Sequence, residues 1–173
     1  MEQELLNGPK ICNPIKNCKP KAKAGFYAIW LKQGSKLSPR FNEELSKRET
    51  HLLYIGRAKD SLLTRLLKQE LQHKNPATFF RSLGAVLGYR PMKGSLIGKR
   101  NQNNYKFSKH DTNAIILWID GNLEVNFIES EMINSFEETL IAKYSPILNW
   151  THSQNKFEPL KTSKDECRLI ARN

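Results

Sequence analysis

Two neighbouring segments of the sequence carry opposite charge, and together they could bind a nucleic acid and a metal ion. Residues 57–109 contain twelve Lys or Arg and two acidic residues, whereas residues 111–138 contain seven Asp or Glu and no Lys or Arg. A basic field attracts polyanions through counterion release, and carboxylate oxygens are the ligands that hard divalent cations take. The charge pattern therefore favours a nucleic-acid-binding protein, and a basic face that is only solvated is the alternative.

Four short motifs contain polar residues in an informative order. Residues 25–27 read Gly-Phe-Tyr, residues 54–56 read Tyr-Ile-Gly, and Arg65 lies in the segment that follows. Residues 137–149 read Glu-x-x-Leu-Ile-x4-Pro-x-x-Asn. Taken alone, the tyrosines could be strand aromatics, the charged residues surface residues and the asparagine a turn residue. No packing rule, however, demands this order of motifs.

The hydrophobic pattern predicts which elements position these motifs. Aromatic and β-branched residues predict strands at 26–31 and 51–55, joined as an antiparallel pair by a long polar loop over 32–50. A stripe of leucines at helical spacing predicts a helix after the second strand, with Arg65 and Gln69 one turn apart on its flank. The remaining expected elements are helices at 78–87, 111–118, 135–144 and 162–171 and a half-buried strand at 123–128.

The motif order resembles that of the GIY-YIG nuclease family, with Phe26 standing where the family has isoleucine. The resemblance covers roughly residues 25–150. Its second half is the more specific signal, because a lone Tyr-Ile-Gly is common at strand ends. The stretches TFFRSLGAVLG and LWIDGNLEV are similar to inserts of a bacterial subgroup that includes restriction-type enzymes, and ECRLIA at residues 166–171 would be its closing helix.

The resemblance implies an α/β (α+β) fold, with a small three-stranded antiparallel sheet flanked by helices. We expect an irregular, basic N-terminal leader at 1–24 and a nuclease domain at 25–150, into which a helical segment is inserted at about 74–110. A C-terminal helical extension is expected at 151–173. The gap between the two motif tyrosines is longer than in compact family members, so the loop at 32–50 is an elaboration.

The resemblance also implies a metal-dependent endonuclease that hydrolyses DNA phosphodiester bonds, with Mg²⁺ or another divalent cation such as Mn²⁺ as cofactor. Glu137 would be the metal ligand. Arg65 would hold and neutralise the scissile phosphate, which its planar fork suits better than a lysine would. Tyr27 and Tyr54 would face the nucleophilic water and the phosphate, with Tyr27 as the first choice for accepting the proton of the water. Asn149 would fix the geometry near the metal-binding helix.

Further residues are expected on the substrate side of this site. Gly56 would let the backbone approach the substrate. A tyrosine with an unperturbed pKa of about 10 leaves little phenolate at neutral pH, so a metal-bound hydroxide or a nearby cation such as Arg57 or Lys59 would have to assist it. Many relatives place a histidine one turn after the arginine, where this sequence has Gln69, with His73 one turn further. The substrate-binding set is therefore Gly56, Arg57, Lys59, Gln69, His73 and Arg81, the last as a structural or DNA-backbone contact.

Two departures from the family pattern leave alternatives open. Arg65 lies eleven positions after Tyr54, one more than the commonest spacing, and this shifts its helical phase unless the turn absorbs a residue. Gln69 in place of a histidine motivates the alternative of a catalytically weak member that serves as a nucleic-acid-binding module. An RNA nuclease is the other alternative, because phosphate contacts do not distinguish the two sugars.

Length and composition exclude several classes of protein. The chain has 173 residues, of which 39% are hydrophobic and 26% charged, as is typical of one globular domain. The longest apolar run, Ala114–Ile119, is too short to span a membrane. Residues 1–10 carry two acidic residues and no apolar core segment, so they do not resemble a secretory signal. Three cysteines without zinc-site spacing fit reduced thiols in a cytoplasmic protein. Because each chain has one motif set, a symmetric double-strand cut would need a homodimer on DNA.

Overall fold

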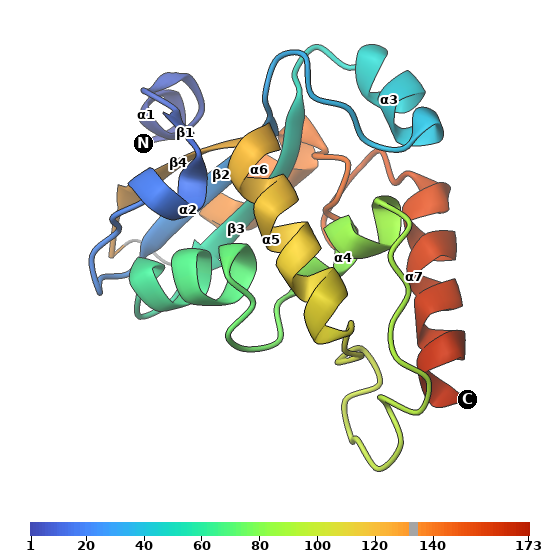
Figure 1. Cartoon of the computed structure of the whole chain (residues 1–173). Helices are drawn as coiled ribbons and strands as arrows, with labels where there is room; N and C mark the ends of the chain where they lie inside the picture. Colours follow the sequence, from blue (N-terminus) through green and yellow to red (C-terminus); the bar gives the residue numbers. More distant parts are fainter. Residues whose placement is uncertain (132–134) are drawn as a thin grey trace.

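Strand β2 (Gly25–Leu31) runs through the middle of an antiparallel sheet in the computed structural model (Figure 1). It pairs with β3 (Leu52–Ala58) on one side and with β4 (Leu123–Glu129) on the other. A short strand, β1 (Ile11–Cys12), pairs with the outer edge of β4, so the strand order is β1-β4-β2-β3. The sheet therefore has four strands, and the expectation of three is wrong.

The additional strand comes from the N-terminal leader, which is more regular than the sequence predicts. Two residues are too few for an alternating pattern to show, yet β1 covers an edge of β4 that would otherwise present unpaired backbone groups. The leader is also tied to the sheet by Asn126 of β4, whose Nδ2 donates to the carbonyl oxygens of Glu4 at 2.8 Å and Leu5 at 2.9 Å. The leader thus packs on the sheet.

Helices cover both faces of the sheet. The helices expected at 78–87 and 135–144 are confirmed to within one residue. The helices expected at 111–118 and 162–171 begin earlier and end later than the sequence predicts. The structure describes residues 1–131 and 135–173. In these residues the helices are α1 (Glu2–Asn7), α2 (Pro14–Asn17), α3 (Pro39–Ser46), the π-helix η1 (Leu63–Leu71), α4 (Thr78–Val86), α5 (Lys109–Asn122), α6 (Phe136–Tyr144) and α7 (Glu158–Arg172).

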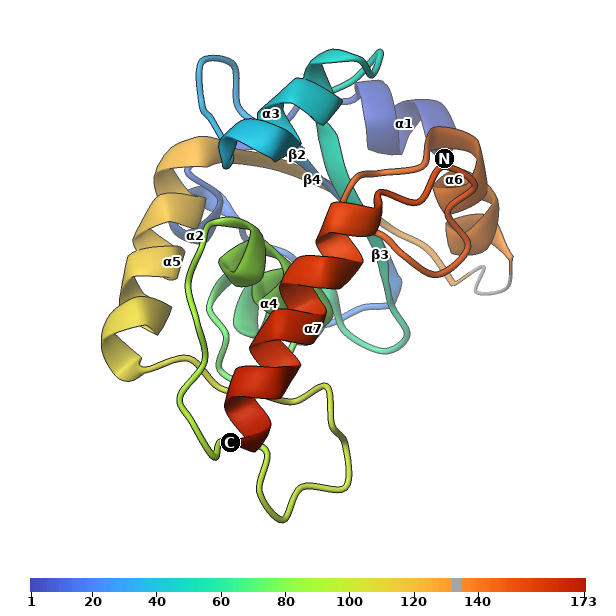
Figure 2. The ribbon, with the colours of Figure 1, turned by 90° about the vertical axis from the view of Figure 1, so that its right-hand side faces the viewer.

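Alternate residues of β2 face two different hydrophobic cores, as the pleat of a strand requires. Tyr27 and Ile29 point into the larger core, which η1, α4, α5 and α7 help to form. Phe26, Ala28 and Trp30 point into a smaller core under α1 and α6. In Figure 2, α1 and α6 lie at the right, α5 lies at the left, and α4 and α7 lie in the middle of the view. The first motif tyrosine is thereby directed toward η1 and its arginine.

A long basic loop joins α4 to α5 and folds back on the C-terminal helix. It contains glycines at positive φ, and the Leu96 amide donates to the Ala171 carbonyl of α7 at 2.9 Å. Helices α4 and α7 pack side by side (Figure 2). Within residues 1–131 and 135–173, every helix is too short or too polar to cross a membrane.

Candidate active site

A buried glutamate that the motifs do not contain lies at the centre of the site. Glu70 is fully buried, and its Oε1 accepts a hydrogen bond from the Tyr27 hydroxyl at 3.3 Å and pairs with Arg65 Nη2 at 2.7 Å. Its Oε2 accepts from the Phe79 backbone amide at 3.0 Å. Burial raises the pKa of Glu70, while Arg65 and these hydrogen bonds oppose the rise. The carboxylate therefore links β2, η1 and the start of α4.

Arg65 and Glu70 meet because η1 is a π-helix. Residues five apart in an α-helix project about 140° from each other at 3.6 residues per turn, whereas in a π-helix they are hydrogen-bonded neighbours. The wider winding shows in the Gln72 amide, which donates to the Leu67 carbonyl at 3.0 Å. Arg65 Nη1 also donates to Gln69 Oε1 at 3.0 Å, so two side chains fix its guanidinium. The π-helical winding thus brings the side chains of Arg65 and Glu70 together.

Glu70 is absent from the residues predicted for the site, although the sequence contains a signal for it. The glutamate stands four residues after Leu66 and directly before Leu71, within the apolar stripe of the helix. An acidic residue is almost never fully buried unless it is paired. A lone glutamate on an apolar stripe therefore indicates a buried carboxylate with a cationic partner nearby.

The two motif tyrosines stack with their ring centroids 6.3 Å apart, but they have different surroundings. Tyr54 lines a cavity, whereas Tyr27 is fully buried. Gly56 lies opposite Tyr27 in the sheet, and a Cβ at Gly56 would lie 2.4 Å from the ring carbon Cζ. Burial raises the pKa of both phenols, so both hydroxyls stay protonated at neutral pH.

Glu137 lies in the first turn of α6, where the positive end of the helix dipole favours a carboxylate. The neighbouring Phe136 packs edge-on against Phe26 of β2, with ring centroids 4.8 Å apart, and this fixes the start of the helix on the sheet. The Glu137 side chain is 27% exposed, and its Oε2 lies 3.9 Å from Arg57 Nε. Burial raises the pKa of Glu137, and the Arg57 and Arg65 charges oppose this rise.

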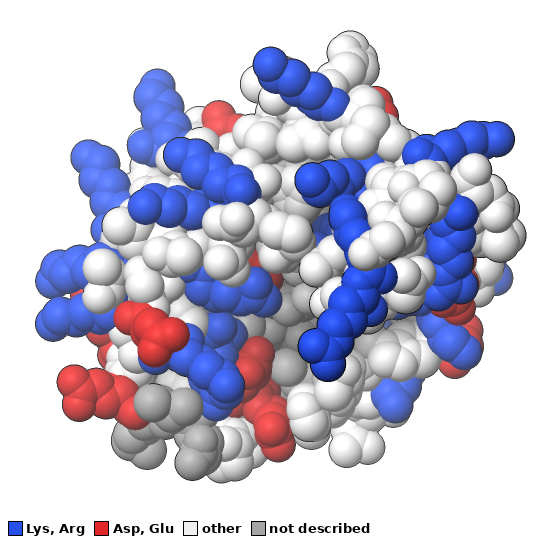
Figure 3. Space-filling model, turned by 90° about the horizontal axis from the view of Figure 1, so that it is seen from below, with Lys and Arg blue, Asp and Glu red and all other residues white. Residues whose placement is uncertain are grey.

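Two cavities share Glu137 in their walls. The Arg65 cavity has a volume of about 520 Å³ and is lined by Arg65, Arg57, Lys59 and Gln69. The Arg81 cavity has a volume of about 510 Å³ and is lined by Tyr54, Arg81, Asn149 and residues of α7. Figure 3 shows Lys and Arg side chains around a hollow in this face of the molecule, with acidic side chains at its edge. The candidate metal ligand thus lies between two groups of cations.

Asn149 holds the segment after α6 against the edge of the sheet. Its Oδ1 accepts from the Ile55 amide and its Nδ2 donates to the Ile55 carbonyl, both at 2.9 Å. The Leu148 amide adds a bond to the Leu53 carbonyl at 2.9 Å. Both ends of the Asn149 side chain are therefore used on the backbone of β3, which makes it a positioning residue.

His73 lines neither of the two cavities that contain Glu137. Its ring stacks flat on Phe80, with centroids 4.1 Å apart and an interplanar angle of 9°, and its backbone has a φ of 50°. Burial, together with the Arg81 and Lys106 charges, lowers the pKa of His73 to about 4. This histidine is consequently neutral at physiological pH and packs on α4.

The donor set around Glu137 fits a divalent cation that also binds the substrate. The described residues contain no group of three or more His, Cys, Asp or Glu side chains that could hold a metal ion by themselves. Asp60 lines the Arg65 cavity with Glu137, which gives that cavity two carboxylates. Magnesium is usually held by one or two carboxylates together with phosphate oxygens and waters. Glu137, with Asp60 near it, is suited to this kind of site.

Comparison with known proteins gives one match. A family model described as the GIY-YIG catalytic domain matches residues 25–166. No curated protein and no solved structure matches the chain. The restriction-type subgroup stays a prediction. The matched region covers most of the chain and contains the two tyrosines, Arg65, Glu137 and Asn149 in the order described above. The chain belongs to the GIY-YIG nuclease family.

Proposed function

We propose that this protein is an endonuclease that hydrolyses DNA phosphodiester bonds with a divalent cation, Mg²⁺ or Mn²⁺, bound at Glu137. The observation that carries the proposal is the position of Glu137 between two cation-lined cavities, one of which contains an arginine fixed by two side chains. A cation bound there would neutralise charge on the phosphate and on the leaving oxygen.

Arg65, Tyr54 and Tyr27 have separate roles in the proposed reaction. Arg65 offers a preorganised fork to the scissile phosphate, because Gln69 and Glu70 hold its guanidinium before substrate arrives. Tyr54 faces the Arg81 cavity as a protonated phenol and donates a hydrogen bond to a phosphate oxygen. The sequence favours Tyr27 for accepting the proton of the water. Since its hydroxyl is buried and donates to Glu70, we assign Tyr27 a positioning role.

Cleavage of supercoiled plasmid tests this function. In Mg²⁺ or Mn²⁺ the protein should convert the plasmid to open-circle or linear product, and EDTA should stop the reaction. Glu137→Gln should abolish cleavage but retain DNA binding, because binding depends on the basic surface. The matched control is Glu138→Gln, which alters an exposed neighbour 3.7 Å from His152 and should cleave normally. Wild-type cleavage by Glu137→Gln would refute the metal assignment.

The same experiment separates the alternatives. A family member that only binds nucleic acid would retain plasmid affinity without cleavage, and Gln69, which offers no proton-transfer group, would then be the first residue to change to histidine. A parallel reaction with single-stranded RNA distinguishes an RNA nuclease. Cleavage of RNA but not of plasmid would overturn the DNA assignment.

Domain organisation and assembly are part of the proposal. We place the catalytic core at 25–150 and treat 1–24 and 151–173 as extensions that pack on it. Under a restriction role, two centres related by a two-fold axis would cut both strands, so we expect a dimer on DNA. Light scattering with and without a duplex measures this. A monomer on DNA that yields only open-circle product would reject the dimer and the restriction role.

A further inference from the structure

Three cations converge on the Arg81 cavity, and two of them come from the C-terminal helix. Arg81 lies on α4, and Lys164 and Arg168 lie one turn apart on α7, which packs against α4 (Figure 2). Arg168 pairs with Asp165 and donates from Nε to Asn103 Oδ1 at 2.9 Å. The cluster therefore carries more positive than negative charge on the side chains that form it.

Arg81 is the most informative member of the cluster. The residue is only 7% exposed, and among the described residues its Nη1 has no hydrogen-bond partner. Its guanidinium carbon lies 6.0 Å from the centre of the Tyr105 ring, which supplies a cation–π contact but no acceptor. A buried charge without an acceptor is costly to the folded state. The Nη1 end of this guanidinium therefore lacks an acceptor among the described residues, although the nearby charge of Glu70 opposes the fall in the pKa of Arg81 that burial causes.

In the part of the chain that the structure describes, the Lys164 ammonium group also lacks a hydrogen-bond acceptor. Within residues 1–131 and 135–173, no hydrogen bond or ion pair involves its ammonium group. Burial and the nearby charges of Arg168 and Arg81 lower the pKa of Lys164 to about 8. Two desolvated cations that repel each other, in a cavity open to solvent, would both be stabilised by one bound anion.

We propose that Arg81, Lys164 and Arg168 form a second phosphate-binding site, which holds another phosphate of the strand that is cut. This site rests on the proposed nuclease function, because Glu137 lines both cavities and a strand bound beside it at Arg65 continues into the second. Arginine and lysine side chains are the usual phosphate ligands. The C-terminal helix thus belongs to the substrate-binding surface.

DNA affinity measured without metal tests the site separately from catalysis. A labelled duplex is titrated in EDTA at several salt concentrations. Lys164→Gln should weaken binding about fivefold to tenfold near 0.1 M salt and reduce the log–log salt slope by about 0.9, the value of one phosphate contact. Because it removes a repelling cation, it should also raise the melting temperature by about 2–4 °C. The control is Lys36→Gln, which removes an exposed lysine outside both cavities and should change none of these.

A loss of affinity combined with a gain of stability distinguishes a ligand site from a structural one, since a structural lysine would lower stability when removed. Arg81→Gln should weaken binding similarly, and Lys164→Gln keeps the test valid if that variant fails to fold. Equal affinity and slope for Lys164→Gln and Lys36→Gln would overturn the site.

Two further arms identify the anion and separate the two proposals. Inorganic phosphate should raise the melting temperature of the wild type but not of Lys164→Gln. If phosphate stabilises the wild type while duplex affinity is unaffected by Lys164→Gln, the cavity binds a free anion and the strand phosphate is refuted. Wild-type protein that binds duplex as expected but never cleaves would refute the nuclease while the site stands. If the wild type cleaves plasmid but Lys164→Gln binds the duplex with wild-type affinity, the second phosphate site is refuted while the nuclease function stands.

Discussion

Replacing Glu70 by glutamine tests whether the buried carboxylate holds the site together. The carboxylate is surrounded by hydrogen-bond donors, among them the Tyr27 hydroxyl, the Arg65 guanidinium and the Phe79 amide. An amide NH₂ must therefore face a donor at one end, and an unsatisfied buried group costs about 1–3 kcal/mol. Breaking a buried ion pair costs about 3–5 kcal/mol. Because the Arg65 side chain is 30% exposed and water can solvate it, we expect about 2–3 kcal/mol.

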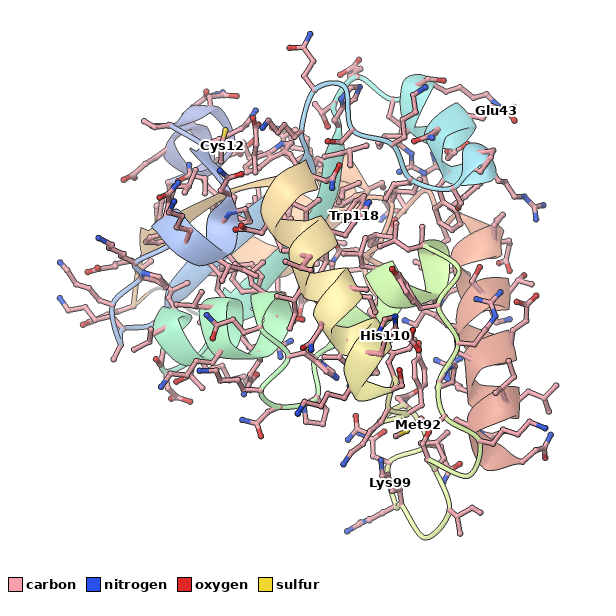
Figure 4. All side chains as sticks on the ribbon, in the orientation of Figure 1. Cys12, Glu43, Met92, Lys99, His110 and Trp118 are labelled. Carbon is pink, nitrogen blue, oxygen red and sulfur yellow. The ribbon has the colours of Figure 1, made fainter. Side chains whose placement is uncertain are left out.

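The expected loss is measurable in both stability and turnover. For a chain of this length it corresponds to a fall in melting temperature of about 4–12 °C, which circular dichroism would detect. Turnover should fall about 100-fold, because a guanidinium released from its partner is misplaced by about 1 Å. Affinity for DNA should change little. The control is Glu43→Gln on α3 (Figure 4), which removes an exposed ion pair with Lys47 and should alter neither the melting temperature nor the turnover.

The reasoning is refuted if Glu70→Gln melts at the wild-type temperature and cleaves plasmid at the wild-type rate. Arg65 would then be held by Gln69 alone, and the π-helical winding would have no part in positioning it. A fall in stability with unchanged turnover would limit Glu70 to a structural role.

Three further predictions concern residues around this centre. Gly56→Ala should destabilise the protein by about 1–3 kcal/mol, because its Cβ would overlap the Tyr27 ring, whereas Gly121→Ala, with open space around it, should not lower the unfolding midpoint. Asn149→Leu should cost about 1–3 kcal/mol in denaturant unfolding without lowering DNA affinity, since it leaves two backbone groups of β3 unpaired. Because the pKa of His73 falls from about 6.5 in the unfolded chain to about 4 in the folded one, stability is fully present above pH 6.5 and declines toward pH 4. His73→Asn introduces a residue that tolerates the positive φ at this position. The variant should lose about 1–2 kcal/mol less unfolding free energy than the wild type between pH 6.5 and pH 4, a value reduced for the partial exposure of the ring. Equal pH profiles of stability for the two proteins would contradict this.

Local patterns predict the central elements well because those patterns arise from burial. The apolar run of β2 corresponds to a strand that is buried on both faces, and the leucine stripe of η1 corresponds to a helix face that packs on the core. The motif order is sufficient for the family, and in the folded chain Arg65 and Glu137 line the same cavity. What each of these residues contacts depends on the folded chain.

The missed features depend on tertiary structure. The two residues of β1 form a strand only because β4 offers an open edge. The π-helical winding of η1 cannot be read from spacing, because its leucines also fit an α-helix. Lys164 and Arg168 look like surface charges of an amphipathic helix, and only the packing of α7 on α4 brings them to Arg81.

The two motifs that give the family its name fit each other physically. Tyr27 of the first lies opposite Gly56 of the second, and its ring occupies the space that any side chain at Gly56 would need. That position brings the Tyr27 hydroxyl to Glu70, which in turn holds Arg65. One chain of contacts therefore connects the two strands to Arg65, from glycine to tyrosine, carboxylate and guanidinium. On this argument Tyr27 is needed for catalysis without touching the substrate, and Tyr27→Phe, which keeps the ring but loses the hydroxyl, should reduce turnover less than Arg65→Lys does. Equal losses in plasmid cleavage would instead place the Tyr27 hydroxyl at the reacting phosphate.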